Sequence, residues 1–132
     1  MFRSSVFNST LRLYSCLYFC LLSVSASAAE RFVGEGTAYS TITAAIRDAE
    51  SGDIITIRAG QYDETIETTV DGLTLRADPE GGEVLVTSFG RVLRINHSNI
   101  TIEGLILDGQ YGDRDVVQIR DEGNYTTLRD VE

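Results

Sequence analysis

Lysine is absent from this sequence, because all 11 of its basic residues are arginine. Histidine occurs once, at His97, and the two cysteines, Cys16 and Cys20, both lie near the N-terminus. A chain that loses this N-terminal segment would have no thiol and therefore no disulfide. Core packing and backbone hydrogen bonds would have to hold it together, even after an export route that permits disulfides.

Positive charge is also scarce relative to negative charge. The chain has 20 acidic residues against 11 basic ones, which gives a formal net charge of −9. All the acidic residues follow residue 29, together with nine of the arginines. This balance argues against nucleic acid or an anionic membrane as a partner. It suits an exported acidic protein whose ligand is neutral, cationic, or an acidic polymer bridged by calcium.

The N-terminal segment has the features of a secretory signal peptide. Two arginines accompany an apolar run over residues 13–24, "LYSCLYFCLLSV", and the small residues of "ASAA" follow it. We therefore expect residues 1–29 to be a signal peptide, with cleavage after Ala28 or Ala29. The mature domain, residues 30–132, would then be secreted or periplasmic, with no membrane attachment.

Two other interpretations of this segment are membrane anchors. An uncleaved transmembrane anchor is disfavoured because the apolar run has about a dozen residues, whereas a span needs about 20. A lipid anchor would need a cysteine at the end of the run. Cys16 and Cys20 lie inside it, and the bulky Phe19 precedes Cys20.

Helical periodicity occurs once in the rest of the chain. The apolar residues that would share one helical face are Ile42, Ala45, Ile46 and Ala49. Ser40 is a suitable N-cap for this helix, and Gly52 a suitable residue after its C-terminus. Because the apolar stripe is narrow and half alanine, it could cover a small apolar surface but could not anchor a helical bundle.

After Gly52 the sequence consists of short β-rich runs separated by Gly, Asn or Asp. The runs "GLTLRA", "NITIEG" and "YTTLRD" align with Leu73, Ile100 and Thr126 in register, at steps of 27 and then 26 along the chain. A second set aligns at a step of 24: Val92 and Ile95 with Val116 and Ile119. A repeat period of about 25, with three short strands per copy, predicts an all-β solenoid in which each copy forms one turn.

In such a coil, equivalent strands pair about 4.8 Å apart and their inward side chains stack into ladders. The residues expected in one apolar ladder region are Leu73, Leu75, Ile100, Ile102 and Leu128. Gly104 would lie where the chain bends from one face to the next, with Leu105 and Leu107 facing the same core. A sandwich with Asp-Gly hairpin loops is the alternative, but it does not account for the repeat.

The segment "YSTITAAIRDAESGDIITIRAGQYDETI" followed by "NITIEGLILDG" resembles the start of right-handed parallel β-helix proteins with the pectin-lyase-like fold. The resemblance covers residues 39–132. It implies a short helix that caps the N-terminal end of the coil. Members of this family include lyases of pectate, alginate and chondroitin-type polymers, hydrolases, epimerases and non-enzymatic surface proteins, so the fold does not select a function.

The coil also looks unfinished. At this period the residues after Asp53 make about three turns, and the last residues, "LRDVE", have a strand pattern. Solenoids need a cap at each end, and none is evident at this one. We therefore expect an N-terminal piece of a longer protein whose C-terminal coils are missing. A complete chain that dimerises end to end is the alternative.

Several residues are candidates for chemistry, although none defines a catalytic centre. Lyases of this fold commonly need a basic residue to remove a proton beside a carboxylate, and calcium or arginine to neutralise that carboxylate. The arginines that could face outward into a groove are Arg76, Arg94, Arg120 and Arg129. The simpler interpretation is that each is solvated or ion-paired, so the catalytic residues stay unknown.

One loop combines acidic and aromatic side chains. Asp108, Asp113 and Asp115 lie in "DGQYGDRDVV", and oxygen ligands at such spacing suit calcium. Tyr111 in the same loop could stack on a sugar ring. Because the pattern is weakly specific, turn-forming aspartates are the simpler interpretation. No other cofactor is evident.

The remaining polar motifs are interpreted as parts of the coil. His97 has no visible cysteine or serine partner and is expected to be a turn residue. The glycosylation sequons begin at Asn96, Asn99 and Asn124. Asparagine tolerates a positive φ, so these residues are expected at bends of the coil.

Two function classes follow from these expectations. The first is a secreted enzyme acting on a polysaccharide, such as a lyase or glycoside hydrolase with its active site beyond residue 132. The second is a non-catalytic surface or periplasmic β-helix protein for adhesion or carbohydrate binding. Polysaccharide is the expected partner in both.

Overall fold

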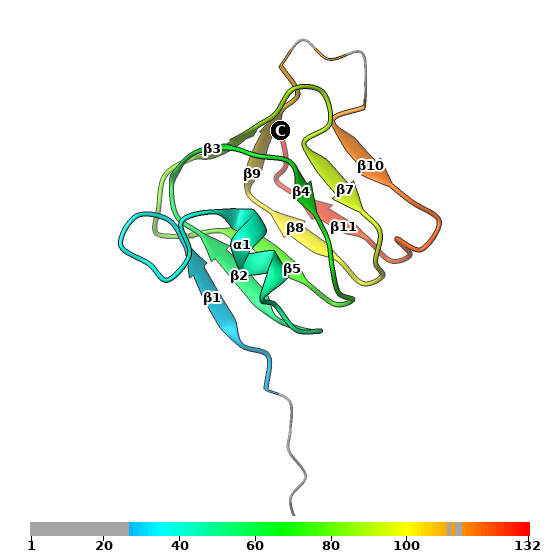
Figure 1. The fold of residues 1–132 in the computed structure, drawn as a ribbon, viewed down its shortest axis with the longest axis horizontal. Coiled ribbons are helices and arrows are strands. Elements are labelled where there is room, and N and C mark those ends of the chain that lie inside the picture. Colours follow the sequence, from blue (N-terminus) through cyan, green and yellow to red (C-terminus); the bar gives the residue numbers. More distant parts are fainter. Residues whose placement is uncertain (1–26, 111, 113–114) are drawn as a thin grey trace, which may run out of the picture.

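The computed structural model describes residues 27–110, 112 and 115–132, and these form an all-β parallel solenoid of about four turns. The first sheet has the order β1 (Glu30–Val33), β2 (Ile54–Ile57), β5 (Thr74–Ala77), β8 (Thr101–Glu103) and β11 (Thr127–Arg129). The second sheet contains β3 (Gly60–Asp63), β6 (Val84–Thr87) and β9 (Leu105–Asp108). The third contains β4 (Ile66–Glu67), β7 (Leu93–Ile95) and β10 (Val117–Ile119). In Figure 1 the strands of the first sheet follow one another in chain colour from blue to red.

The strand registers confirm the period read from the sequence. Thr74 pairs with Thr101, and Thr101 with Thr127, at the predicted steps of 27 and then 26. Ile95 pairs with Ile119 at the predicted step of 24. Because all the described strand pairs are parallel, the antiparallel sandwich alternative is wrong.

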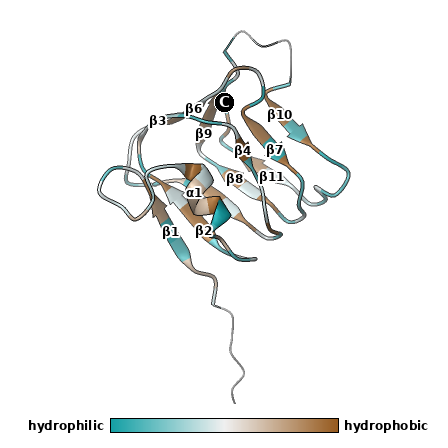
Figure 2. Cartoon of the chain, viewed as in Figure 1, coloured by the Kyte–Doolittle hydropathy of each residue, from teal (hydrophilic) through white to brown (hydrophobic). Residues whose placement is uncertain are grey.

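The core is the interior of the coil, where inward side chains of successive turns stack. Leu75 pairs with Ile102, and both are fully buried, as predicted. Leu73 and Ile100 are also fully buried. Leu128 is in register with Ile102, but 43% of its surface is exposed on β11, the last strand of the sheet. Figure 2 shows hydrophobic and hydrophilic segments alternating within the strands, which fits a period of two.

Gly104 forms the predicted corner between β8 and β9. Its φ of +69° lies in the left-handed region, which glycine adopts without a steric penalty. A Cβ at this position would lie 3.1 Å from the Cβ of Ala77 in the preceding turn. Leu105 and Leu107, which follow the corner, are both buried, so the chain bends and continues around the same core.

Two local features differ from the sequence prediction. The residues before α1, for which no strand was predicted, contain β1. This strand pairs with β2, so the coil has about four turns rather than the three expected after Asp53. The helix is shorter than expected: α1 (Ile42–Arg47) has Thr41 as its N-cap, not Ser40, and Asp48 as its C-cap, well before Gly52. The Thr41 side chain accepts a hydrogen bond from the backbone N–H of Ala44, which satisfies a donor at the start of the helix.

α1 packs against β1, β2 and β4 through Ile42, Ala45 and Ile46, which are buried. The predicted signal peptide lies almost entirely in residues 1–26, outside the described residues, as do both cysteines. Within the part of the chain that the structure describes, no helix is long and apolar enough to cross a membrane.

Candidate functional site

The four arginine candidates lie on two different faces of the solenoid. Arg76 and Arg129 belong to β5 and β11 of the first sheet. Arg76 Nη2 lies 2.6 Å from a carboxylate oxygen of Glu30, and Arg129 Nη1 lies 3.5 Å from one of Glu103. Both pairs join one turn of the coil to another. These two arginines therefore have the structural partners that the simpler interpretation expected.

The Glu30 carboxylate also ties three strands together. It accepts a hydrogen bond from the Thr56 hydroxyl at 2.7 Å, and Arg76 Nε donates to the same hydroxyl at 3.0 Å. The hydrogen bonds from Thr56 and Arg76 hold the pKa of Glu30 below its usual value. The outer face of the first sheet is thus a network of satisfied polar groups.

Arg94 and Arg120 lie on the side formed by the third sheet. In β7, Arg94 is in register with Glu67 of β4 on one side and with Gln118 of β10 on the other. Arg94 Nη1 lies 3.2 Å from Glu67 Oε2, and the Asn96 side-chain amide donates to Glu67 Oε1 at 2.6 Å. Three turns of the coil thus place polar side chains in one row.

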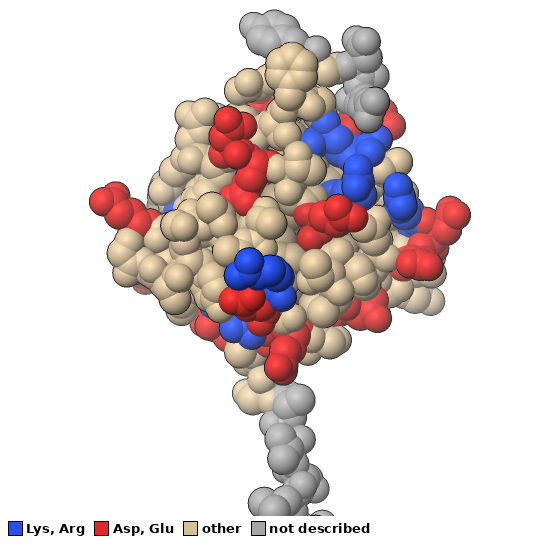
Figure 3. All heavy atoms as spheres, viewed as in Figure 1, with Lys and Arg blue, Asp and Glu red and all other residues tan. Residues whose placement is uncertain are grey.

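A shallow depression of about 240 Å³ adjoins this row. Asn96, Arg120, Asp121 and Glu122 line it, and Arg120 follows directly after β10. In Figure 3, basic side chains gather beside acidic ones on the part of the surface that overlies β7 and β10. The outer face of the third sheet and this depression form the candidate site, which we call the polar face: Glu67, Arg94, Asn96, Gln118, Arg120 and the adjoining Asp121 and Glu122.

Three side chains of the polar face hold buried polar atoms without a hydrogen-bond partner among the described residues. These atoms are Arg94 Nε, Asn96 Oδ1 and Gln118 Oε1. These atoms are shielded from solvent, but each of the three side chains is partly exposed, so its other N–H groups could donate to a sugar ligand. This arrangement suits binding. Glu67 is engaged by both Arg94 and Asn96, which disfavours this carboxylate as a general base.

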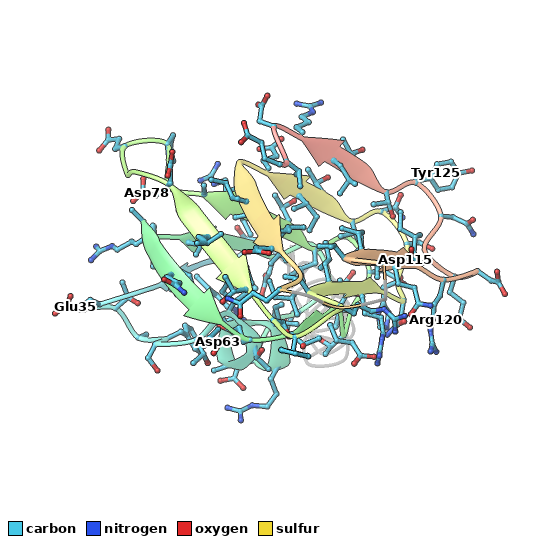
Figure 4. The ribbon with its side chains drawn as sticks, turned by 90° about the horizontal axis from the view of Figure 1, so that it is seen from above. Glu35, Asp63, Asp78, Asp115, Arg120 and Tyr125 are labelled. Atoms are coloured by element: carbon cyan, nitrogen blue, oxygen red, sulfur yellow. The ribbon has the colours of Figure 1, made fainter. Side chains whose placement is uncertain are left out.

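The structure places the remaining candidates apart from one another. His97 Nδ1 lies 3.1 Å from the buried Thr68 hydroxyl, a contact that ties the histidine to the preceding turn. The exposed Asp108 carboxylate accepts a hydrogen bond from the Gln110 N–H at 3.1 Å, as expected of a turn aspartate. Asp115 precedes β10 and Arg120 follows it, and both lie on the same side of the molecule in Figure 4.

The predicted calcium loop is only partly described. Asp113 and Tyr111 lie outside the described residues. Within residues 27–110, 112 and 115–132, no three His, Cys, Asp or Glu side chains come together to hold a metal ion. Calcium binding in this loop therefore stays a prediction.

Of the three sequon asparagines, one has the predicted bend conformation. Asn99 has a φ of +58°. At the third sequon the positive φ belongs instead to Tyr125, at +59°, and 83% of that tyrosine is exposed. Asn96 has a different role, because its side chain belongs to the polar face.

Sequence reasoning missed Glu67, Asn96 and Gln118 as members of one site. A signal was present, because the repeat that aligns Val92 with Val116 also places Arg94 level with Gln118. Glu67 precedes the aligned copies and lies in a two-residue strand, so no sequence pattern pointed to it.

Comparisons with known proteins do not place this chain in a family. No family model, no curated protein and no solved structure matches this chain.

Proposed function

We propose that this protein is exported and binds a polysaccharide through the polar face. The observation that carries the proposal is the row of Arg94, Asn96 and Gln118 across adjacent turns, next to the depression that Asn96 and Arg120 line. Sugars are recognised by such mixed sets of donors and acceptors, and guanidinium groups bind carboxylates in pairs of hydrogen bonds. A polymer with carboxylate groups therefore fits this face best.

Overall charge opposes such a ligand, and the polar face itself combines two arginines with three carboxylates. The chain carries a net charge of −9, so an acidic polymer would be repelled at long range. That repulsion is screened beyond about 8 Å at physiological ionic strength. At contact the ligand would meet Arg94 and Arg120. A calcium ion could bridge its carboxylates to the nearby acidic side chains. We therefore expect binding to strengthen with added calcium.

The handedness of the coil and its fold type are also part of this proposal. We infer that the solenoid is right-handed and of the pectin-lyase-like type. Three parallel sheets around one coil and the resemblance of residues 39–132 support that type. The handedness follows from the general rule that crossovers between parallel strands are right-handed in about 98% of cases. An experimental structure with a left-handed coil would refute it.

Binding is tested with oligosaccharides cut from pectate, alginate and chondroitin-type polymers, titrated calorimetrically into the protein. We expect Arg94→Gln and Arg120→Gln each to weaken binding by about tenfold or more, because a charge-assisted hydrogen bond contributes about 1.5–3 kcal/mol. The matched control is Arg129→Gln, which removes an exposed arginine from the first sheet. Equal losses from all three substitutions, or no binding by the wild type, would contradict the polar face as the site.

The two function classes share this binding step. A polysaccharide lyase or hydrolase must hold its polymer, and so must a non-catalytic adhesion protein. The proposal therefore commits to binding, and an assay for cleavage of the polymer separates the two classes.

A further inference from the structure

A buried carboxylate lies at the start of the coil, at a position that is apolar in the next two turns. Asp53 directly precedes β2, as Leu73 precedes β5 and Ile100 precedes β8. Only 3% of its surface is exposed. A buried charge is tolerated when opposite charge and hydrogen bonds compensate it. The hydrogen-bond donors around Asp53 therefore explain how this carboxylate is stabilised inside the coil.

Its two oxygens have different partners. Oδ2 accepts hydrogen bonds from Arg31, at 3.1 Å from Nε and 2.8 Å from Nη2, and from the Glu50 N–H at 2.9 Å. Oδ1 accepts one from the backbone nitrogen of Ala29 at 2.9 Å. Arg31 thus occupies one side of the carboxylate, and Ala29 the other.

Among the described residues, Ala29 is the first that forms a hydrogen bond with the rest of the fold. Besides the contact of its nitrogen with Asp53, its carbonyl oxygen accepts a hydrogen bond from the Ile54 N–H at 2.9 Å. Ser27 and Ala28 are exposed, and neither forms a hydrogen bond within the described residues. Within the described part of the chain, hydrogen bonding to the coil therefore begins at the nitrogen of Ala29.

The sequence places a cleavage signal at the same boundary. Residues 26–28 read Ala-Ser-Ala, which is the A-x-A pattern of small residues recognised at the end of a signal peptide. We propose that a signal peptidase cleaves the Ala28–Ala29 bond and that the new ammonium group of Ala29 forms an ion pair with the buried Asp53. This inference rests on the proposed export of the protein, and it selects one of the two cleavage positions that the sequence alone left open.

The proposed step is an ordinary hydrolysis. Water adds across the Ala28–Ala29 peptide bond, the C–N bond breaks, and the hydroxyl stays on the Ala28 carbonyl carbon. The resulting carboxyl proton passes through solvent to the Ala29 amine, so the products are a carboxylate and an ammonium. The leader departs with Ala28 as its C-terminus.

Cleavage at this bond would change the charge of the group that faces Asp53 Oδ1. A neutral N–H donor becomes a cation at hydrogen-bond distance from Oδ1, and a charged donor makes a stronger bond than a neutral one. Cleavage one residue later would remove Ala29 altogether. Both its donor to Asp53 and its acceptor for Ile54 would be lost. The fold therefore fits an N-terminus at Ala29 rather than at Glu30.

The first test is to express residues 1–132 with the native leader in a bacterial host and to determine the mass and N-terminal sequence of the exported product. The expected N-terminus is Ala29. Recovery of the intact chain would overturn the export proposal and this inference together. An N-terminus at Glu30 or elsewhere would overturn this inference alone and leave export standing.

The absence of lysine makes the second test selective. The processed chain would carry a single primary amine, its N-terminus, so an amine-reactive acylating reagent reports on Ala29 alone. An ammonium held by a buried carboxylate releases its proton less readily and reacts more slowly. We expect the folded wild type to react about tenfold more slowly than Asp53→Asn near pH 7, since below the pKa of the amine each unit of increase lowers the free amine about tenfold.

The control is Asp63→Asn, which removes an exposed carboxylate on β3 and should leave the rate unchanged. A further comparison does not require the variant to fold: the wild-type amine should react about tenfold faster in concentrated urea than in the native protein. Equal rates in native and unfolded wild type would overturn the ion pair even if cleavage occurs after Ala28. Slow acylation that persists in Asp53→Asn, with faster acylation in urea, would show that burial rather than Asp53 protects the amine.

Discussion

At the scale of single residues, neighbouring positions on one strand meet different surroundings. Ile102 stacks in register between Leu75 and Leu128 and is fully buried. Thr101 lies beside it on the outer face, in register with Thr74 and Thr127. Substitution by a charged residue should therefore change the free energy of unfolding very differently at these two adjacent positions.

We expect Ile102→Asp to lower the free energy of unfolding by several kcal/mol, because it buries an unpaired charge in the core. The matched control, Thr101→Asp, should lower it by less than about 1 kcal/mol. Urea denaturation of both variants of the full chain checks the difference. Equal losses would mean that the assigned inward and outward faces are wrong.

The buried Asp53 makes stability depend on pH. Burial alone would raise the pKa of this carboxyl. The hydrogen bonds from the N–H groups of Glu50 and Ala29 and from the Arg31 guanidinium lower it by more, so its pKa lies below the usual value. The charged carboxylate therefore stabilises the fold above its unfolded pKa of about 3.9. This contribution is lost as the pH falls from there through the folded pKa.

Thermal unfolding between pH 6 and pH 2 tests this expectation. The wild type should lose stability steeply below about pH 4, and Asp53→Asn, already less stable at pH 6, should lose less over the same range. Asp63→Asn, which alters an exposed carboxylate, should follow the wild type. If the stability of Asp53→Asn fell with pH in parallel with that of the wild type, other carboxylates would be responsible for the loss of stability in acid.

At the scale of elements, the helix is held by a residue far along the chain. Glu64, between β3 and β4, accepts hydrogen bonds from the backbone N–H groups of Ile42 and Thr43, each at 2.8 Å. The Thr43 hydroxyl donates to the same carboxylate. A helix of six residues is too short to be stable by itself, so this contact and the buried face of α1 keep it in place.

Replacing Glu64 by Ala should therefore lower stability by about 1–2 kcal/mol, because the N–H groups at the start of α1 lose their acceptor. Amide hydrogen exchange in α1 should accelerate more than exchange in β8, which lies in the first sheet two strands from β2. The control, Glu83→Ala, alters an exposed acidic residue outside this contact. Unchanged protection of α1 would contradict the role given to Glu64.

The same contact explains which parts of the elements could be predicted from sequence. The stripe of Ile42, Ala45 and Ile46 revealed the helix, but its start depends on Thr41 and on the distant Glu64, which local patterns do not show. β1 was missed because "ERFV" has no aligned copy and carries two charged residues in four positions. Its pairing with β2 became evident only in three dimensions.

At the scale of the whole molecule, the repeat made the fold predictable and the site unpredictable. The regular steps between Leu73, Ile100 and Thr126 specified parallel turns, because only stacked copies bring equivalent positions together. The polar face, in contrast, draws Glu67 and Gln118 to opposite sides of Arg94 from the turns before and after it. Its chemistry depends on which side chains meet across turns, and composition alone could not reveal that.

We expect the exported product of this chain to leave pectate, alginate and chondroitin-type polymers uncleaved, with and without calcium. The chain has no lysine to serve as a base, and Arg76, Arg94 and Arg129 each form an ion pair. Four turns spaced about 4.8 Å apart also present only about 15–20 Å of surface to a polymer.

Ultraviolet absorbance of new unsaturated ends measures lyase activity, and an assay of reducing ends measures hydrolysis. Binding without turnover would favour the non-catalytic class. Sustained turnover that Arg120→Ala abolishes would show that the polar face is a catalytic site.

The parallel registers also determine how the chain can fold. Each described strand pairs with its equivalent in the adjacent turn rather than with its neighbour in the sequence, so these strands offer no β-hairpin from which folding could start. Every new turn must close a loop of similar length, and the entropy of closure differs by only about 0.3 kcal/mol between the shortest and longest loops. The first pairing of two turns is therefore the slow event, and it has no preferred location set by loop length. Later turns add to an existing edge, so folding should proceed like the closing of a zipper.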